Sequence, residues 1–204
     1  MRLLYLVSLL LLVAITACGH QSPLEPPWPP DPPVYREPPQ VDQEIVDRIL
    51  DKILCFEGYI CELDFPPDEI WGGLEEVYAQ SVADGEHVAA KVALYVMGQA
   101  GMIEFLPTLV SALDVYPSTA CGSLSFMPSD YAVYAVIPYL DSEDRMLRED
   151  AANSLGRFRY YSQFPGARYY ALAALEDRLC IEKEEWLHSE IIDNIVIILS
   201  GMQE

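Results

Sequence analysis

The sequence predicts an all-α protein built as a short stack of about eight helices. Three observations favour this fold class. After residue 41, apolar residues recur at steps of three and four through most of the chain. Short segments rich in proline, glycine and small polar residues separate these windows. The alternation of apolar and polar residues that is typical of strands never lasts long enough to build a sheet.

The composition limits the class of partner. The chain has 204 residues, with 12 Lys and Arg against 32 Asp and Glu, which gives a net charge of −20. Because 51% of the residues are apolar, the chain is long enough and apolar enough to fold. This charge argues against a nucleic-acid partner, since phosphate binding needs a basic surface. It also argues against electrostatic docking on anionic lipid.

An apolar segment at the N-terminus indicates export. Arg2 is the only charged residue of the first 18, and an apolar stretch of 13 residues, interrupted only by a serine, covers residues 3–15. This length is typical of the apolar region of a signal peptide. It is shorter than the roughly 20 residues that a membrane-spanning helix needs. The stretch ends in the letters ITAC at residues 15–18.

The letters ITAC resemble the lipobox of bacterial lipoproteins, in which an aliphatic residue and two small residues precede an obligatory cysteine. The resemblance implies that the sulfur of Cys18 carries lipid, that residues 1–17 are removed, and that the protein is held on a membrane. Gly19 favours the outer membrane, with the protein facing the periplasm or the cell surface. The alternative is an ordinary signal peptide that ends at Ala17.

Residues 18–40 are predicted to be a proline-rich, disordered tether. Nine of the 16 prolines of the chain lie between residues 21 and 40. Proline fixes φ and has no N–H donor, so neither a helix nor a sheet passes through such a segment. Twenty residues of polyproline II, at about 3.1 Å each, would hold the folded part up to roughly 60 Å from the membrane. The alternative is a docking segment for an aromatic-lined groove, with Trp28 and Tyr35 as anchors.

The helical domain covers residues 41–204. Its first helix begins at Val41 and ends before Gly58, and its second begins after Pro66 and Pro67, with Asp68 as the candidate cap. Residues 115–128, VYPSTACGSLSFMP, are predicted to form a long loop. The remaining helices are expected at residues 86–99, 103–113, 131–140, 147–158, 167–179 and 184–199.

One window of the helical domain resembles a HEAT repeat. Residues 137–156, IPYLDSEDRMLREDAANSLG, contain Pro138 in a first helix, an acidic turn at 141–144, and Arg148 in a second helix. Weaker copies are found at residues 82–98, 103–113 and 171–201. The resemblance implies a short HEAT-like α-solenoid whose two-helix units stack on one another, with Arg148 pairing with the acidic turn. The alternative is a generic all-α bundle.

Three glycines are predicted to end the second helices of these units. Gly98, Gly156 and Gly201 follow apolar helical windows, and glycine is the residue most often found just past a helix end. Their spacings are 58 and 45 residues, so the copies are irregular in length.

Four cysteines remain beside Cys18. An even number in an exported chain favours disulfides, and we expect the pairs Cys55–Cys61 and Cys121–Cys180. A free buried thiol at Cys180 is the alternative. Zinc is excluded because no CxxC pair is present and the three histidines are scattered.

No catalytic motif is present in the sequence. It lacks HExxH, GxSxG and a phosphate-binding glycine loop, so we expect no enzyme, no cofactor and no metal. The acidic turn at 141–144 lacks the glycine and the final glutamate of a calcium loop, which makes it a solvated turn.

One segment is a candidate for binding another protein. Residues 157–170, RFRYYSQFPGARYY, hold three arginines and six aromatic residues, which are types that contribute most of the binding energy at interfaces. The alternative is packing between helices. The candidate contact residues are Arg157, Arg159, Tyr160, Tyr161, Arg168, Tyr169 and Tyr170.

These features predict a membrane-anchored, non-catalytic module that binds an unidentified protein of the bacterial cell envelope. Two alternatives stay open. The first is an enzyme, because some HEAT-like proteins are lyases that attach bilin pigments to proteins. A pocket with convergent polar groups would favour it. The second is a purely structural envelope lipoprotein without a contact surface.

Overall fold

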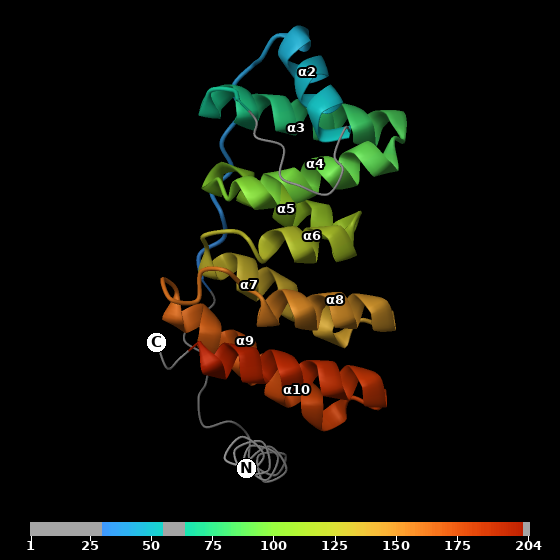
Figure 1. The fold of residues 1–204 in the computed structure, drawn as a ribbon, viewed down its shortest axis with the longest axis vertical. Coiled ribbons are helices and arrows are strands. Elements are labelled where there is room, and N and C mark those ends of the chain that lie inside the picture. Colours follow the sequence, from blue (N-terminus) through green and yellow to red (C-terminus); the bar gives the residue numbers. More distant parts are fainter. Residues whose placement is uncertain (1–29, 55–63, 202–204) are drawn as a thin grey trace.

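The structure, a computed structural model, describes residues 30–54 and 64–201, and this part of the chain contains helices and no strand (Figure 1). The all-α prediction is confirmed for these residues. The α-helices are α2 (Gln43–Leu54), α3 (Pro67–Asp84), α4 (His87–Ala100), α5 (Leu106–Ser111), α6 (Pro117–Leu124), α7 (Asp130–Val136), α8 (Arg145–Gly156), α9 (Pro165–Ile181) and α10 (Glu185–Ser200). Short 3₁₀ segments are η1 (Ile103–Phe105), η2 (Ala112–Asp114) and η3 (Ile137–Asp141).

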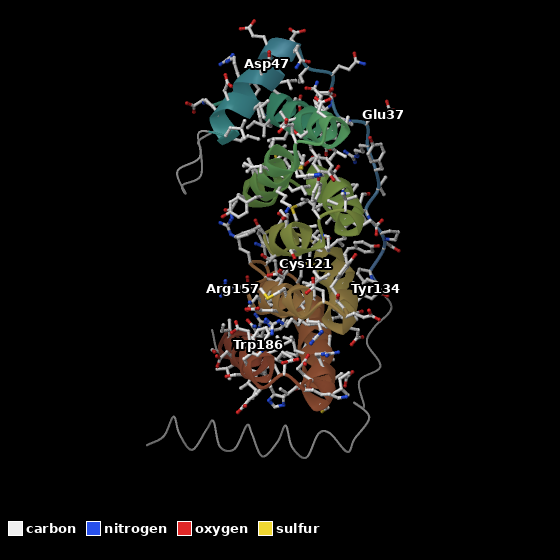
Figure 2. The ribbon with its side chains drawn as sticks, turned by 90° about the vertical axis from the view of Figure 1, so that its right-hand side faces the viewer. Glu37, Asp47, Cys121, Tyr134, Arg157 and Trp186 are labelled. Atoms are coloured by element: carbon white, nitrogen blue, oxygen red, sulfur yellow. The ribbon has the colours of Figure 1, made fainter. Side chains whose placement is uncertain are left out.

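The helices form two layers that run along the long axis of the molecule (Figures 1 and 2). In one layer α4 packs on α6, α6 on α8 and α8 on α10. In the other layer α5 packs on α7 and α7 on α9, and α3 contacts η1 at the start of the α5 segment. Helix α2 lies across α3 and α4 at the N-terminal end. A continuous apolar core lies between the layers, from Ile49 in α2 to Ile198 in α10.

The predicted loop at residues 115–128 is wrong, because residues 117–124 form helix α6. Its sequence, PSTACGSL, has few strong helix formers, but α6 is held on both sides by α4 and α8. Its small side chains let α4 come close. A Cβ atom added at Gly98 of α4 would lie 2.7 Å from the carbonyl oxygen of Ser123. The small residues therefore serve helix packing and do not break the helix.

Two of the predicted helix ends need correction. Asp68 is not a cap, since α3 begins at Pro67, where the missing N–H costs nothing. Gly98 does not end α4, which continues to Ala100 and is closed by Gly101 with a left-handed φ of 62°. Gly98 instead allows a close helix crossing. Gly156 and Gly201 lie at the ends of α8 and α10, as predicted, and Gly156 is also at a close crossing. A Cβ atom at Gly156 would overlap the side-chain amide of Asn194 in α10.

Residues 30–42, which we call the strap, lie along the side of the stack (Figure 1). At one end Pro39 and Val41 touch Gly72 of α3. At the other end Asp31 and Pro33 share a cavity with residues of α5 and with Ser129, which precedes α7. The prediction that the tether reaches away from the folded part is therefore wrong for residues 30–40. The rest of the tether lies outside the described residues.

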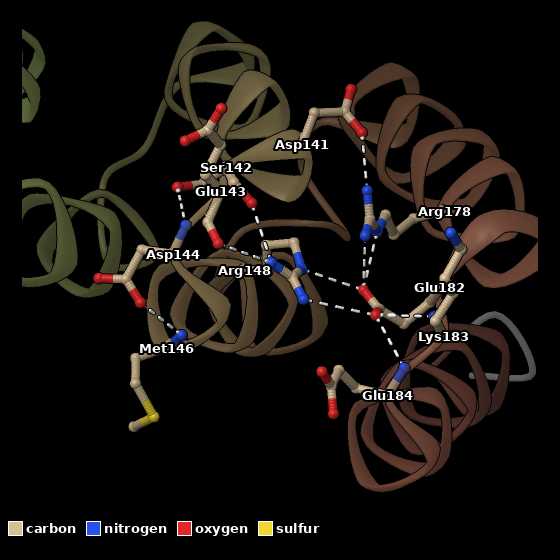
Figure 3. Close-up of polar contacts among 10 residues, drawn as sticks. All are labelled: Asp141, Ser142, Glu143, Asp144, Met146, Arg148, Arg178, Glu182, Lys183 and Glu184. Atoms are coloured by element: carbon tan, nitrogen blue, oxygen red, sulfur yellow. Dashed lines mark hydrogen bonds and ion pairs between the residues drawn. The ribbon is translucent and has the colours of Figure 1, made fainter.

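A buried carboxylate joins the last two hairpins (Figure 3). Glu182, whose side chain is 1% exposed, accepts hydrogen bonds from Nε of Arg148 at 3.0 Å and from Nη2 of Arg178 at 2.7 Å. Arg148 also donates to the carbonyl oxygens of Ser142 and Glu143, as its predicted pairing with the turn requires. The turn, α8 and the α9–α10 connection thus form one hydrogen-bonded unit.

The pKa of Glu182 follows from these contacts. Burial raises the pKa of this carboxyl group, but hydrogen bonds from the backbone N–H groups of Glu184 and Lys183 and from both arginines outweigh burial and lower the pKa to about 2. The group therefore stays ionised throughout the neutral range and acts as a structural ion-pair partner.

Candidate functional site

The predicted lipid attachment residue, Cys18, and the signal peptide lie outside the described residues, as does Trp28 of the tether. Within the part of the chain that is described, none of the helices combines the length and the apolar character needed to cross a bilayer.

The cysteines differ from the prediction. Cys121 is a free thiol, fully buried in α6, so the expected Cys121–Cys180 disulfide is wrong. Burial, with a smaller contribution from the charge of Asp150, raises the pKa of the Cys121 thiol to about 12. Cys180 lies exposed at the end of α9 and is disulfide-bonded. Cys55 and Cys61 also lie outside them.

The seven predicted contact residues do not form one surface. Arg157, Arg159 and Tyr169 are exposed, Tyr160 and Arg168 are half-buried, and Tyr161 and Tyr170 are only 7% and 8% exposed. The segment turns from α8 into α9 between the two layers, so its side chains alternate between the core and the solvent. The prediction is wrong for Tyr161 and Tyr170, for which the packing alternative holds.

The two buried tyrosines have structural contacts. The hydroxyl of Tyr161 donates a hydrogen bond to the carbonyl oxygen of Leu155, and burial raises the pKa of this hydroxyl. The guanidinium of Arg168 lies 5.9 Å from the centre of the Tyr161 ring. The ring of Tyr170 meets the ring of Tyr134 edge to face, with 6.4 Å between their centres. These side chains fix the α8–α9 connection.

The exposed part of residues 157–170 lies near two aromatic residues from other hairpins, Tyr95 and Phe126. The backbone N–H of Arg159 donates to the carbonyl oxygen of Ser125 at 2.9 Å, which ties the loop to the end of α6. The hydroxyl of Tyr160 and the carbonyl of Phe126 both lie beside Gly101. The ring of Phe126 meets that of Tyr95 on α4 edge to face at 6.5 Å.

We name this group the Arg–Tyr surface and define it by five residues: Tyr95, Phe126, Arg157, Arg159 and Tyr160. The guanidinium of Arg159 lies 5.9 Å from the ring centre of Tyr160, and Arg157 extends into solvent. Such a surface offers flat rings for stacking and bidentate donors for carboxylates or carbonyls. Tyr95 and Phe126 could not be found from the sequence, because only the packing of successive hairpins places them beside residues 157–160.

Cavities lined by described residues lie on the other layer of the stack. One, of about 280 Å³, separates the strap from α5 and is lined by Arg36 and Glu104 among others. The second, of about 340 Å³, is a groove between α7 and α9. Tyr134 lines this groove, and Figure 2 shows Tyr134 on the side of the stack opposite Arg157. Its charged groups are Asp141, Asp177 and Arg178.

The one arginine that lines this groove is already held by ion pairs. Arg178 is bound to Glu182 and, at 3.1 Å, to Asp141, so its donors already have acceptors. Among the described residues, no three His, Cys, Asp or Glu side chains come together in a way that could hold a metal ion. The rest of the groove lining is mostly apolar and includes Tyr134 and Tyr170.

Comparison with known proteins finds no matching family model, no matching curated protein and no matching solved structure.

Proposed function

We propose that this protein is a lipid-anchored, non-catalytic module that binds another protein at the bacterial cell envelope. One observation carries the anchoring part of the proposal: a 13-residue apolar stretch is followed directly by ITAC, with Cys18 at the acylated position. Several acyl chains, at about 0.8 kcal/mol per buried CH₂ group, would hold the acidic protein on a membrane that its charge does not favour. We place it on the outer membrane, facing the periplasm or the surface.

The folded part is proposed to be a HEAT-like solenoid. Three features support this reading. Successive helices alternate between two layers, so each hairpin contacts the next. Arg148 donates to the carbonyls of the turn that precedes α8. Two glycines 58 residues apart, Gly98 and Gly156, occupy equivalent crossings two hairpins apart, against Ser123 and Asn194 respectively.

The proposed contact surface is the Arg–Tyr surface. It differs from the segment expected from sequence, because Tyr161 and Tyr170 belong to the core and Tyr95 and Phe126 are added. Arginine and tyrosine are enriched at interfaces and among the central residues that contribute most of the binding energy. Binding would be non-covalent, on a rigid helical surface.

A crosslinking pull-down from membranes tests the binding part. We expect the partner to be captured by the wild type and lost with Arg157→Ala, Arg159→Ala, both of which are exposed and leave the core intact. The matched control is Arg145→Ala, an exposed arginine on α8 outside the Arg–Tyr surface. Equal capture by the double variant would remove this surface from the proposal. Absence of any partner would favour a purely structural envelope lipoprotein.

The enzyme alternative is tested at the groove between α7 and α9. A lyase would need convergent polar groups free to act on a ligand, and the one arginine of this groove is bound by Glu182 and Asp141. Binding of a small tetrapyrrole to the purified protein, abolished by Tyr134→Ala, would favour the enzyme.

A further inference from the structure

The direction of the strap shows toward which end of the stack the N-terminal part of the chain leads. Residues near Pro33 lie beside α5 and the start of α7, whereas Pro39 lies beside α3. The strap therefore runs opposite to the order of the helices, and its first residues lie beside Leu106 of α5 and Ser129, which precedes α7 (Figure 1). Only residues 19–29 separate Cys18 from the start of the strap.

The length of that segment limits where an anchor at Cys18 lies. At about 3.1 Å per residue, a polyproline II chain from Cys18 to Pro30 would span about 37 Å. From α7, the C-terminal end of the stack is one helix away, through α9. This distance is about 15 Å when the radius of the last helix is included. The opposite end is three helices away, through α5, α3 and α2, which is at least about 30 Å. A lipid attached at Cys18 would therefore reach well beyond α10 but only just beyond α2.

The charge distribution favours the same end. The described residues from 42 to 86 hold eleven acidic and two basic side chains, whereas residues 157–201 hold seven acidic and five basic ones. A lipid surface that carries anionic headgroups repels the first group more strongly once it lies within about 8 Å, the screening length at physiological salt. Figure 2 shows Asp47 at the acidic end and Trp186 at the other end.

We infer that the stack stands on the lipid surface with α9 and α10 next to the membrane and with α2 and α3 directed away from it. The inference rests on the proposed anchor at Cys18. The end that meets the lipid carries exposed apolar side chains, among them Tyr169, Val196 and Ile197. It also carries Glu176, Glu185 and Asp193, so the contact is shallow and does not replace the anchor.

Two native tryptophans make this orientation measurable. Trp186 lies on α10 and Trp71 on α3, at opposite ends of the stack. The lipidated protein is placed in phosphatidylcholine vesicles that contain a headgroup spin-labelled lipid as quencher. One variant keeps only Trp186 (Trp28→Phe, Trp71→Phe), and the other keeps only Trp71 (Trp28→Phe, Trp186→Phe). We expect Trp186 to be quenched about threefold more than Trp71, because contact quenching falls off within one helix diameter of about 10 Å.

Equal quenching, or stronger quenching of Trp71, would overturn the orientation. Flotation of the same vesicles reports the anchor separately. A protein that fails to float, with an unmodified Cys18 by mass spectrometry, would overturn the proposed function and the inference with it, whereas a floating protein with equal quenching overturns only the inference. Gly72→Leu, which displaces the strap, should reduce the quenching of Trp186 while flotation is unchanged; full quenching in this variant would show that the strap does not orient the stack.

Discussion

Gly72 of α3 lies directly against the backbone of Pro39, so that a Cβ atom at position 72 would overlap the carbonyl oxygen of Pro39 and come within 2.9 Å of Cγ1 of Val41. The strap is thus seated on a position that only glycine leaves open. Glycine inside a helix costs about 0.5–1 kcal/mol relative to alanine, and here that cost is offset by the close approach of the strap.

Gly72→Ala should detach the strap from α3. We expect trypsin to cleave after Arg36 about tenfold faster than in the wild type, since a loss of about 1.4 kcal/mol in strap binding raises the open population tenfold. Cleavage is followed by mass spectrometry. The control is Gly122→Ala, a helical glycine with no atom within 4 Å of an added Cβ. Unchanged cleavage in Gly72→Ala would show that the strap is not held at this position.

Glu182→Gln should destabilise the stack by about 3 kcal/mol, because it leaves the guanidinium groups of Arg148 and Arg178 without their buried carboxylate. Urea unfolding at pH 7 measures this change. The control is Asp141→Asn, which also removes a partner of Arg178 but whose carboxylate is 75% exposed, so we expect a loss below about 1 kcal/mol. Equal effects of the two variants would contradict the central role of Glu182.

The same carboxylate gives a pH dependence. Its pKa in the folded protein, about 2, is below the ordinary value of 4.5, so the folded state binds fewer protons than the unfolded state between these values. The stability it contributes is fully present above about pH 4.5 and is lost as the pH falls toward 2. The unfolding free energy of the wild type should therefore drop over this window by more than that of Glu182→Gln. Parallel pH profiles of the two proteins would contradict the assignment.

Tyr161→Phe should cost about 1 kcal/mol, because it removes the hydrogen bond to the carbonyl of Leu155 and leaves that carbonyl unsatisfied in the core. Tyr169→Phe is the matched control, since Tyr169 is 51% exposed and the change should stay within about 0.5 kcal/mol. Thermal unfolding distinguishes the two. Partner capture should be unchanged in Tyr161→Phe, which separates the core tyrosine from the Arg–Tyr surface; loss of capture with normal stability would place Tyr161 in the interface.

The fold class was predictable because α2, α4, α8 and α10 each bury one face. Burial of one face requires apolar residues at steps of three and four, and this spacing is visible in the sequence. Helix α6 was not predictable in this way. Its glycine, serines and threonine have low helix preference in sequence, and contact with α4 and α8 offsets this preference. The same residues are therefore typical of a loop in isolation and of a tight crossing in the stack.

The candidate site was predictable only in part for a related reason. A run of arginines and tyrosines shows which residue types are present but not which way each one points. Tyr160 and Tyr161 are neighbours in sequence, yet one contributes to the Arg–Tyr surface and the other to the core. The strap shows a further limit: proline excludes helix and sheet, but only the glycine on α3 shows that the segment docks.

The buried position of Cys121 can be tested by alkylation. Cys121 should resist iodoacetamide at pH 8 in the folded protein, because burial raises its pKa to about 12 and leaves about one thiolate in ten thousand molecules. It should react fully once the protein is unfolded. Fast labelling of the folded protein would contradict its buried position.

Cys180 is disulfide-bonded, and the identity of its partner decides between the two interpretations of the N-terminus. One sulfur atom cannot hold both an acyl-glyceryl thioether and a disulfide. We therefore expect peptide mapping without reductant, on protein extracted from membranes, to give a lipid-modified Cys18 peptide and a Cys180 disulfide that does not include it. Cys180→Ser should leave flotation with membranes unchanged, whereas Cys18→Ser should abolish it. A peptide that links Cys18 to Cys180 would contradict the lipid anchor and favour an ordinary signal peptide that ends at Ala17.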